Sequence, residues 1–364
     1  KWSLEDYILK ARESMVANSE TSEGTIDRIG RWVDFKGAYR TMDKSFMESV
    51  WWAFKTLYES GKIYEGRKVL MYDTKFATPV SKSEVTMDND AYQEVTDPSA
   101  YVKFKVKPGQ KCHNGEWETG ENTYFLAWTT TPWTLPANMA LAVNPEMEYA
   151  EVEVNGDRLY IAKSRAETVL KDVDYKVIYD DIKGSDFVGL AYEPLFGEMG
   201  EVRDEDLNGH TRHRSIKADG TLLDYETPMP LEKSRERVER AHKNAHRVYD
   251  ASFVLGGDGT GIVHIAPAYG EDDYKLSQEK FFPSFDVLDD YGYYVGDSLK
   301  RLHELGVRDT DERGIEIWAG NKFIAKCLEE KGIVWKIEYI KHEYPFNPRS
   351  KQRIMYRAFP SWFF

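Results

Sequence analysis

The spacing of apolar residues predicts where the chain forms helices. Between Asp43 and Gly61 the apolar positions lie three or four residues apart, as on one face of an amphipathic helix. Asp43 can serve as the N-cap and Gly61 as the stop, so we expect a helix over residues 43–60. Ser3 followed by Asp6 has the spacing of a helix start and predicts another helix near the beginning of the chain.

Three more helices are predicted from their ends. Ser164 and Glu167 have the pattern of a capping box, in which each side chain accepts a hydrogen bond from the other residue's backbone. Residues 321–332 carry apolar side chains at helical spacing and end in a glycine. Residues 270–274, Gly-Glu-Asp-Asp-Tyr, place acidic residues where they would complement the positive end of a helix dipole.

Alternation of apolar and polar residues predicts strands through the middle of the chain. Residues 102–107 alternate apolar side chains with lysines, as in a sheet with one solvent-exposed face. Residues 149–154 alternate apolar and polar side chains in the same way. Shorter apolar runs bounded by Gly, Pro or Asn fit buried strands at residues 123–128, 141–143, 159–162 and 262–265. We therefore expect a mixed α/β, strand-rich fold with peripheral helices.

Residues 197–247 differ in composition from the rest of the chain, because they are charged and poor in large aliphatic residues. We expect a surface excursion there. His242 and His246 lie four residues apart on a polar helical stretch, the spacing that would place two imidazoles on one face for zinc. The stretch lacks both the glutamate of a metalloprotease and a third ligand, so we interpret it as a solvated face and expect no metal.

Composition narrows the class of protein. The chain has 364 residues, 41% of them hydrophobic, which suffices for a large core. No run approaches the roughly 18 apolar residues of a membrane span, and residues 1–12 are unlike a signal peptide, so we expect a cytoplasmic protein. Two cysteines, Cys112 and Cys327, form neither a disulfide framework nor a zinc motif. The net charge of −13 argues against sequence-blind nucleic-acid binding, so any such contact must be local.

Two segments carry candidate chemistry. Residues 128–138, WTTTPWTLPAN, place three threonines between tryptophans, although threonine is also an ordinary strand residue and Pro132 would end a strand. The glycine-rich residues 256–261 precede a strand rather than a helix, so they indicate a tight turn with positive φ or a close backbone approach to a ligand. The chain has no G-x-S-x-G elbow, which disfavours covalent hydrolysis.

Taken singly, His264 and Asp273 have ordinary interpretations as a core histidine and a helix-dipole complement. Taken together, WTTTPWTLPANMALAVNP (residues 128–145) and GTGIVHIAPAYGEDDY (residues 259–274) resemble the editing domain of isoleucyl-tRNA synthetases, the insertion called connective peptide 1. Valyl and leucyl relatives typically have Thr-Thr-Arg-Pro where this chain has Thr-Thr-Pro-Trp.

The resemblance implies a domain organisation. Residues 1–85 would be a helical flanking segment that borders the catalytic Rossmann domain, residues 86–340 the barrel-like editing core, and residues 341–364 the return segment. The HIGH and KMSKS signatures of the aminoacylation site are absent, so aminoacylation is not expected. The implied partners are the 3′ end of tRNA(Ile), its mischarged form Val-tRNA(Ile), and the remainder of the synthetase in cis. We expect a monomer without membrane contact, cofactor or metal.

The resemblance also implies roles for individual residues. Asp273 would pair with the α-ammonium of the substrate, and His264 would line the side-chain pocket and help reject isoleucine. Trp128 would form a pocket wall, and the backbone at Gly259 and Gly261 would approach the tRNA end. The residues implied to contact the terminal nucleotide, the ester and the attacking water are Thr129, Thr130, Thr131, Thr134 and Asn138. The implied reaction is post-transfer editing; the alternative is an inactive module that binds the tRNA 3′ end or aminoacyl-adenosine.

Overall fold

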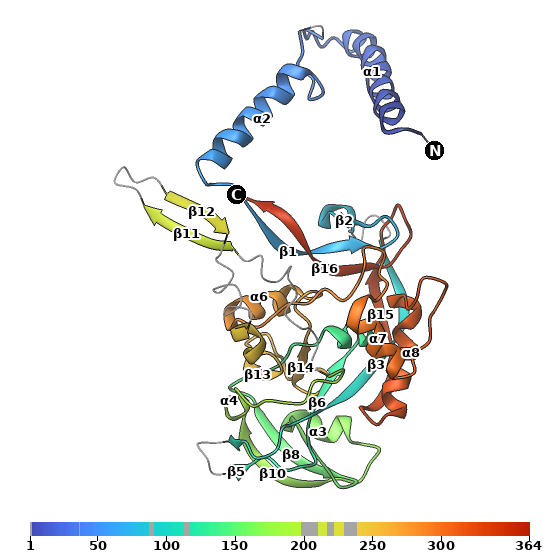
Figure 1. The fold of residues 1–364 in the computed structure, drawn as a ribbon. Helices are drawn as coiled ribbons and strands as arrows, with labels where there is room; N and C mark the ends of the chain where they lie inside the picture. The colour runs from blue at the N-terminus through green and yellow to red at the C-terminus, as the bar shows by residue number, and fades with distance from the viewer. Residues whose placement is uncertain are drawn as a thin grey trace. The chain divides into compact units, whose positions relative to one another are not determined.

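Long antiparallel strands dominate the computed structural model of the protein (Figure 1). The chain divides into two compact units, unit 1 (residues 1–64, 214–224 and 364) and unit 2 (residues 65–213 and 225–363). For residues 18–21, 210–216 and 222–228 only the backbone is described. The structure describes residues 2–35, 37–86, 91–112, 117–197, 210–216, 222–228 and 239–364.

Unit 1 contains the two predicted N-terminal helices, α1 (Leu4–Arg28) and α2 (Lys44–Glu59). Ser3 caps α1 by accepting a hydrogen bond from the Asp6 backbone at 3.1 Å, as predicted. Asp43 occupies the N-cap position of α2, and Gly61 follows it with a positive φ of 70°. Both helices are confirmed. No residue of α2 is buried, and Trp51 and Trp52 are exposed.

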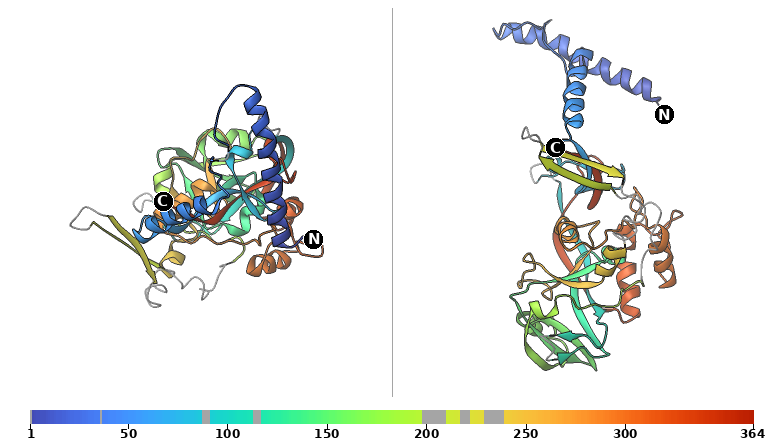
Figure 2. Two further views of the ribbon diagram at one scale, coloured as in Figure 1. Left: turned by 90° about the horizontal axis from the view of Figure 1, so that it is seen from above. Right: turned by 60° about the vertical axis from the view of Figure 1, so that its left-hand side comes forward.

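Unit 2 is built around a six-stranded sheet in the order β10-β8-β9-β6-β3-β15. Its pairs are antiparallel except for β6 with β9. The two longest strands, β3 and β15, run side by side through the unit (Figure 1, Figure 2). The strands are β3 (Tyr92–Lys105), β6 (Thr123–Thr129), β8 (Glu148–Val154), β9 (Asp157–Ala162), β10 (Lys176–Lys183) and β15 (Val334–Pro345).

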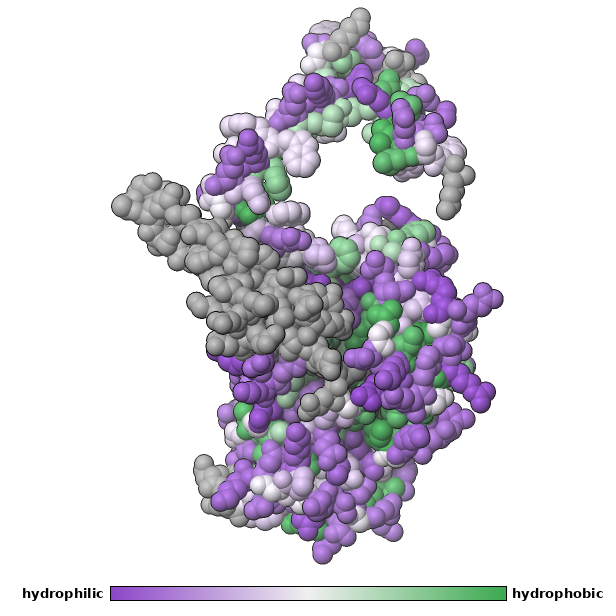
Figure 3. Space-filling view, in the orientation of Figure 1, coloured by the Kyte–Doolittle hydropathy of each residue, from purple (hydrophilic) through white to green (hydrophobic). Residues whose placement is uncertain are grey.

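Alternation along β3 explains where the core lies. Val102, Phe104 and Val106 are buried, whereas the lysines between them are partly exposed. Phe104 and its partner Phe125 on β6 belong to the same core cluster. The period-two pattern therefore identifies the face of the sheet that packs on this cluster, while Tyr101 and Leu126 belong to a second buried cluster. On the face drawn in Figure 3, apolar side chains appear as separate patches among hydrophilic ones.

A three-stranded sheet in the order β13-β7-β14 packs beside β6 and carries much of the candidate site. β7 (Ala140–Val143) is buried at every position, and it pairs parallel with β13 (Arg247–Asp250) and antiparallel with β14 (Ile262–Ile265). The 3-10 helix η4 (Pro132–Ala137) joins β6 to β7.

A second three-stranded sheet, β16-β1-β2, consists of β1 (Tyr64–Asp73), β2 (Thr78–Val80) and β16 (Ile354–Phe363). The hairpin of β11 (His210–Ile216) and β12 (Leu222–Pro228) lies in the predicted excursion, part of which is outside the described residues. The remaining elements are η1 (Lys82–Glu84), β4 (Lys111–Cys112), β5 (Trp117–Glu118), α3 (Lys163–Val169), α4 (Gly184–Phe187), α6 (Glu271–Lys280), α7 (Gly296–Glu304) and α8 (Ile317–Glu330).

The mixed α/β, strand-rich fold class is confirmed, and the described strands form open sheets. Two helix starts were wrongly predicted. α3 begins at Lys163 with Ala162 as its N-cap residue, because β9 runs directly into it, so Ser164 and Glu167 form no capping box. α8 begins at Ile317, where the Glu316 side chain caps it by accepting from the Ala319 backbone at 2.8 Å.

The domain boundaries at residues 85 and 340 stay predictions. Among the described helices, none has the length and apolar character needed to cross a bilayer. Within the same described residues, no group of three or more His, Cys, Asp and Glu side chains could hold a metal ion.

Candidate functional site

The threonine run lies where β6 ends and η4 begins. Thr129 still pairs with Ala100 of β3, but Pro132 lacks a backbone N–H and cannot extend the ladder. The chain turns there, and the Thr131 backbone N–H donates to the Thr129 hydroxyl at 3.1 Å. The Thr131 hydroxyl lies 3.3 Å from both the Thr129 and the Thr134 hydroxyls. The turn thereby gathers three hydroxyl groups.

A directed set of hydrogen bonds connects these hydroxyls to His264. Asn138 Nδ2 donates to the Ala140 carbonyl at 2.9 Å, which fixes the orientation of its amide. The same Nδ2 group contacts His264 Nδ1 at 3.1 Å, so Nδ1 must be the acceptor. The ring proton is then on Nε2, which donates to the Thr134 hydroxyl at 2.8 Å. Thr134 in turn donates to the Thr131 carbonyl at 2.8 Å.

Tyr192 extends this set and was missed by sequence reasoning. Its hydroxyl donates to Asn138 Oδ1 at 2.7 Å, and the side chain is fully buried. The contact joins residues 54 positions apart, and no motif around Tyr192 signals it. We call the set of Thr129, Thr131, Thr134, Asn138, Tyr192 and His264 the threonine cluster.

The threonine cluster carries no charge at neutral pH. Burial lowers the pKa of His264 to about 4, because a charged imidazole would lose its hydration there. Burial raises the pKa of Tyr192 well above its ordinary value. Both ring nitrogens of His264 are already used, so the imidazole is held in one orientation.

Asp273 lies in the first turn of α6, as predicted, and reaches the end of β14. Its carboxylate accepts a hydrogen bond at 2.8 Å from the backbone of Ala266, which directly follows β14. Ala266 is only two residues beyond His264, so Asp273 is bonded to the backbone close to the strand that carries the histidine of the threonine cluster. Burial raises the pKa of Asp273 to about 7, although the Ala266 hydrogen bond acts in the opposite direction.

The glycine turn packs against Trp128. Gly259 and Gly261 have φ of 61° and 74°, so the predicted tight turn with positive φ is confirmed. A Cβ atom on Gly259 would lie 2.8 Å from the Trp128 ring, and one on Gly261 would overlap the Cβ of Ala162. Thr130 is partly exposed and makes no side-chain hydrogen bond with another described residue.

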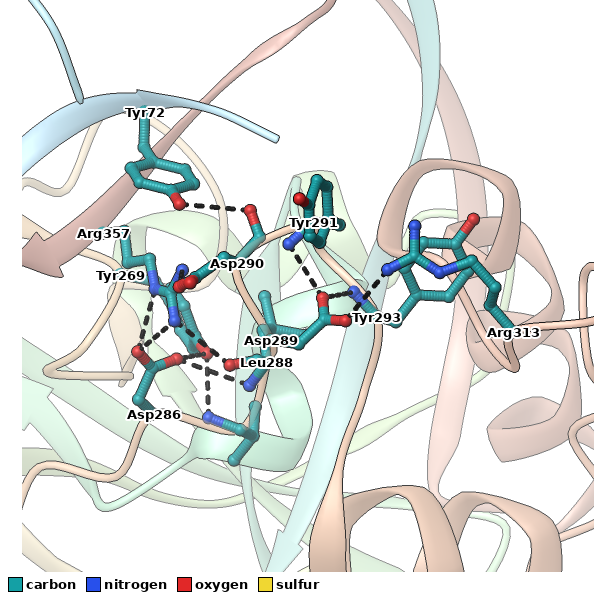
Figure 4. Close-up of polar contacts among 11 residues, drawn as sticks. Tyr72, Tyr269, Asp286, Leu288, Asp289, Asp290, Tyr291, Tyr293, Arg313 and Arg357 are labelled. Atoms are coloured by element: carbon teal, nitrogen blue, oxygen red, sulfur yellow. Dashed lines mark hydrogen bonds and ion pairs between the residues drawn. The ribbon is translucent and has the colours of Figure 1, made fainter. Parts of the chain in front are cut away.

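A second polar group, which we call the arginine network, supports the loop between β14 and α6 (Figure 4). The Tyr269 hydroxyl donates to Asp286 at 2.8 Å and accepts from the Val287 backbone at 2.9 Å. Arg357 of β16 donates to the other Asp286 oxygen at 2.8 Å. The Ala358 backbone also donates to the Ala268 carbonyl at 2.7 Å, so β16 holds this loop directly.

The remaining donors of Arg357 are also occupied. Its Nη1 group donates to Asp290 at 3.0 Å and its Nη2 group to the Leu288 carbonyl at 3.1 Å. The guanidinium lies over the Tyr72 ring, 5.1 Å from its centre, and the Tyr72 hydroxyl donates to the Asp290 carbonyl at 3.1 Å. The arginine network therefore consists of Tyr72, Tyr269, Asp286, Asp290 and Arg357.

His242 and His246 do not form the predicted solvated face. Both are partly buried and line a pocket, and His246 Nδ1 is enclosed without a hydrogen-bond partner. The solvated face does not form because the backbone turns at His246, where φ is 55°, and the His246 ring packs against Tyr192.

Comparison with known proteins identifies the family. A family model described as tRNA synthetases class I (I, L, M and V) matches residues 1–364. The chain belongs to this family. Among class I tRNA synthetases, it is 34% identical to "Isoleucine--tRNA ligase, cytoplasmic" of Saccharomyces cerevisiae and 34% identical to "Isoleucine--tRNA ligase 2" of Pseudomonas fluorescens. Each match covers 100% of this chain and 29% of the relative, so the chain spans less than a third of these synthetases.

The resemblance inferred from the two motifs is thus confirmed by whole-chain similarity to isoleucine–tRNA ligases. Among solved structures, the cytosolic leucyl-tRNA synthetase editing domain of P. knowlesi matches 68% of this synthetase chain and 97% of its own, at 12% identity and a TM-score of 0.39. The residue roles implied by the motifs stay predictions.

Proposed function

We propose that this chain is the editing domain of an isoleucyl-tRNA synthetase and that it hydrolyses the ester bond of Val-tRNA(Ile). The observation that supports this most is that Asp273 bonds the backbone of Ala266, two residues beyond His264 of the threonine cluster. A partly buried carboxylate and a set of fixed hydroxyls, without an activated nucleophile, suit an ester that water attacks directly.

The need for such a site is physical. Valine lacks one methylene of isoleucine, and a binding pocket gains only about 1–3 kcal/mol from a methylene, isoleucyl-tRNA synthetase being the standard illustration. Valine is therefore activated and transferred at an appreciable rate. A second site that admits the valyl ester and excludes the larger isoleucyl ester removes the error.

Asp273 would bind the α-ammonium group of the valyl ester. Its pKa of about 7 in the free chain would fall once the ammonium group is beside it, because an opposite charge favours the carboxylate. The resulting charge-assisted hydrogen bond would orient the ester carbonyl.

His264 would act as a fixed wall rather than as a general base. Its two nitrogens are engaged by Asn138 and Thr134, and its pKa of about 4 leaves it neutral. The hydroxyls of Thr129 and Thr131 would hydrogen-bond the attacking water and the terminal ribose, since each hydroxyl oxygen has two acceptor positions. Thr130, Gly259 and Gly261 would contact the tRNA end, and Trp128 would form a wall of the pocket.

Deacylation of Val-tRNA(Ile) tests the proposal. Asp273→Asn keeps the size of the side chain but removes its charge. Because a hydrogen bond to a charged group contributes about 1.5–3 kcal/mol, we expect kcat/KM to fall by about 10- to 150-fold. Glu279→Gln, on an exposed carboxylate of the same helix, is the matched control and should keep wild-type activity. Equal rates for Asp273→Asn and wild type would overturn the assignment.

The specificity role of His264 is tested with Ile-tRNA(Ile). Removing the ring by His264→Ala should enlarge the pocket and allow hydrolysis of the isoleucyl ester. Folding of the variant is checked by hydrolysis of Val-tRNA(Ile), which it should retain.

The alternative is an inactive module that binds the tRNA 3′ end or aminoacyl-adenosine. The net charge of −13 favours it, because an acidic chain contributes few contacts to a tRNA backbone. Binding of a nonhydrolysable valyl-adenosine analogue without turnover of Val-tRNA(Ile) would establish this alternative. The other synthetase domains would then be needed to position the substrate.

A further inference from the structure

A pocket with a basic lining lies next to Tyr192, the residue that contacts Asn138. Its volume is about 340 Å³, within the range of about 300–1,000 Å³ that is typical of small-ligand sites. Met139 and Ala191, which adjoin Asn138 and Tyr192 in sequence, both line it. We call it the basic pocket because five lining residues have basic side chains: Lys107, His242, Lys243, His246 and Arg247.

Within the part of the chain that the structure describes, the charges of the basic pocket have no acidic partner in its lining. Lys107 and Lys243 are exposed and form no ion pair with another described residue. Glu193, which is close in sequence to Ala191, pairs instead with Lys105 at 3.0 Å. In a chain with a net charge of −13, the three cations Lys107, Lys243 and Arg247 create a local positive potential that attracts anions.

Arg247 is fixed with part of its guanidinium unused. Its Nη1 group donates to the Gly189 carbonyl at 2.8 Å and its Nε group to the Lys243 carbonyl at 3.0 Å. The Nη2 group donates to no other described residue. The side chain is therefore held in place by carbonyl groups, which do not neutralise its charge.

The backbone at His246 gives the pocket a defined shape. His246 has a left-handed φ of 55°, which is unfavourable for a residue other than glycine. The conformation is held by a hydrogen bond from its N–H to the Met139 carbonyl at 2.6 Å and by another from the Tyr192 N–H to its carbonyl at 3.0 Å. These bonds connect the pocket wall to the residues next to the threonine cluster.

We propose that the basic pocket binds a phosphate group. Lys107 and Lys243 supply two ammonium groups, and Arg247 supplies a guanidinium whose geometry matches phosphate oxygens. The phosphate is either a free anion or part of an RNA backbone whose end reaches the threonine cluster. Binding in this pocket requires neither Asp273 nor ester hydrolysis, so its test is independent of the proposed editing reaction.

The test measures binding of two probes by the full chain. Inorganic pyrophosphate is titrated by calorimetry, and a short single-stranded RNA ending in CCA is titrated by fluorescence anisotropy. The pocket variant is Lys107→Gln with Lys243→Gln. The matched control is Lys322→Gln with Lys326→Gln, which removes the same charge from two exposed lysines of α8. Lys107→Arg with Lys243→Arg keeps the charge and checks that the pocket still forms.

We expect the affinity for at least one probe to fall by about tenfold or more in the glutamine pocket variant and to persist in the arginine variant and the α8 control. Binding of pyrophosphate alone identifies a free anion as the ligand. Binding of RNA that pyrophosphate displaces identifies a backbone phosphate. Equal losses in the pocket and α8 variants, or no binding of either probe to the wild type, would overturn the proposal.

Discussion

The threonine cluster is bonded to His264 of β14 and the arginine network to Tyr269 in the loop that follows, yet the buried polar groups of the two are stabilised differently. The threonine cluster contains only neutral hydrogen bonds, because the pKa of its histidine is about 4. The arginine network is ionic, with Arg357 paired to Asp286 and Asp290. Both connect segments far apart in sequence to residues 264–269.

The difference separates a supporting structure from a candidate binding surface. All three nitrogens of the Arg357 guanidinium are used within unit 2, so the arginine network has little capacity for a ligand. The hydroxyls of Thr129 and Thr131 have spare acceptor positions, and Thr130 beside them is partly exposed. A closed ionic network thus holds the loop, while the neutral cluster can exchange partners with a substrate.

The largest expected effect on stability comes from breaking the arginine network. Arg357→Met would leave the Asp286 carboxylate without its cation, whereas Asp290 is 66% exposed and loses little. Removing one partner of a buried pair costs about 3 kcal/mol or more. Urea unfolding should show this loss, and Asp286→Asn in addition should recover part of it. A change below about 0.5 kcal/mol in Arg357→Met would mean that the network is not structural.

The threonine cluster should instead respond to acid. The folded-state pKa of His264, about 4, lies below its ordinary value of 6.5, so the unfolded chain binds the proton more readily. The stability due to a neutral His264 is therefore complete above about pH 6.5 and is lost as the pH falls toward 4. Linkage gives a loss of about 2 kcal/mol between pH 7 and pH 5. His264→Gln should remove this part of the pH dependence in urea titrations.

The acid response has a second contributor, which the measurement must separate. Burial, with Lys107 and His242 nearby, also lowers the pKa of His246 to about 4. His246→Gln is therefore the matched control, and each variant should remove only its own share. An unchanged pH dependence in His264→Gln would show that its imidazole is not buried in the neutral form.

The next effect concerns Asp273, whose pKa of about 7 is shifted in the opposite direction. Its raised pKa means that it contributes stability at low pH and that this contribution is lost as the pH rises from about 4 to 7. If the ionised carboxylate binds the ammonium group, kcat/KM for Val-tRNA(Ile) should rise about tenfold between pH 6 and pH 8. Asp273→Asn should lack this rise, whereas a wild-type profile that is flat over this range would contradict the role.

Sequence reasoning found the parts of the site that are contiguous in the chain. The residues from Trp128 to Asn138 and the strand and helix around His264 form recognisable local patterns, and β6, β14 and α6 lie where predicted. Tyr192 and Arg357 were not found, because their contacts with Asn138 and Asp286 span 54 and 71 residues and follow no periodic pattern.

The predicted starts of α3 and α8 were wrong for a related reason. A capping motif is a local preference, and the chain overrides it when the preceding strand continues to the helix itself. At α8 the cap is the Glu316 side chain, which is not among the preferred N-cap residues, and the first turn begins at the fully buried Ile317.

The smallest predicted effect is at Tyr192, which belongs to the threonine cluster and contacts His246 of the basic pocket. Tyr192→Phe removes only the hydroxyl that donates to Asn138 Oδ1, leaving a buried acceptor unsatisfied at a cost of about 1 kcal/mol. Tyr179→Phe, at an exposed tyrosine of β10, should be neutral in the same urea experiment. Because Asn138 orients His264, Tyr192→Phe should also weaken discrimination against Ile-tRNA(Ile), which Arg357→Lys should not. A stability loss without any change in discrimination would place Tyr192 with the supporting residues instead.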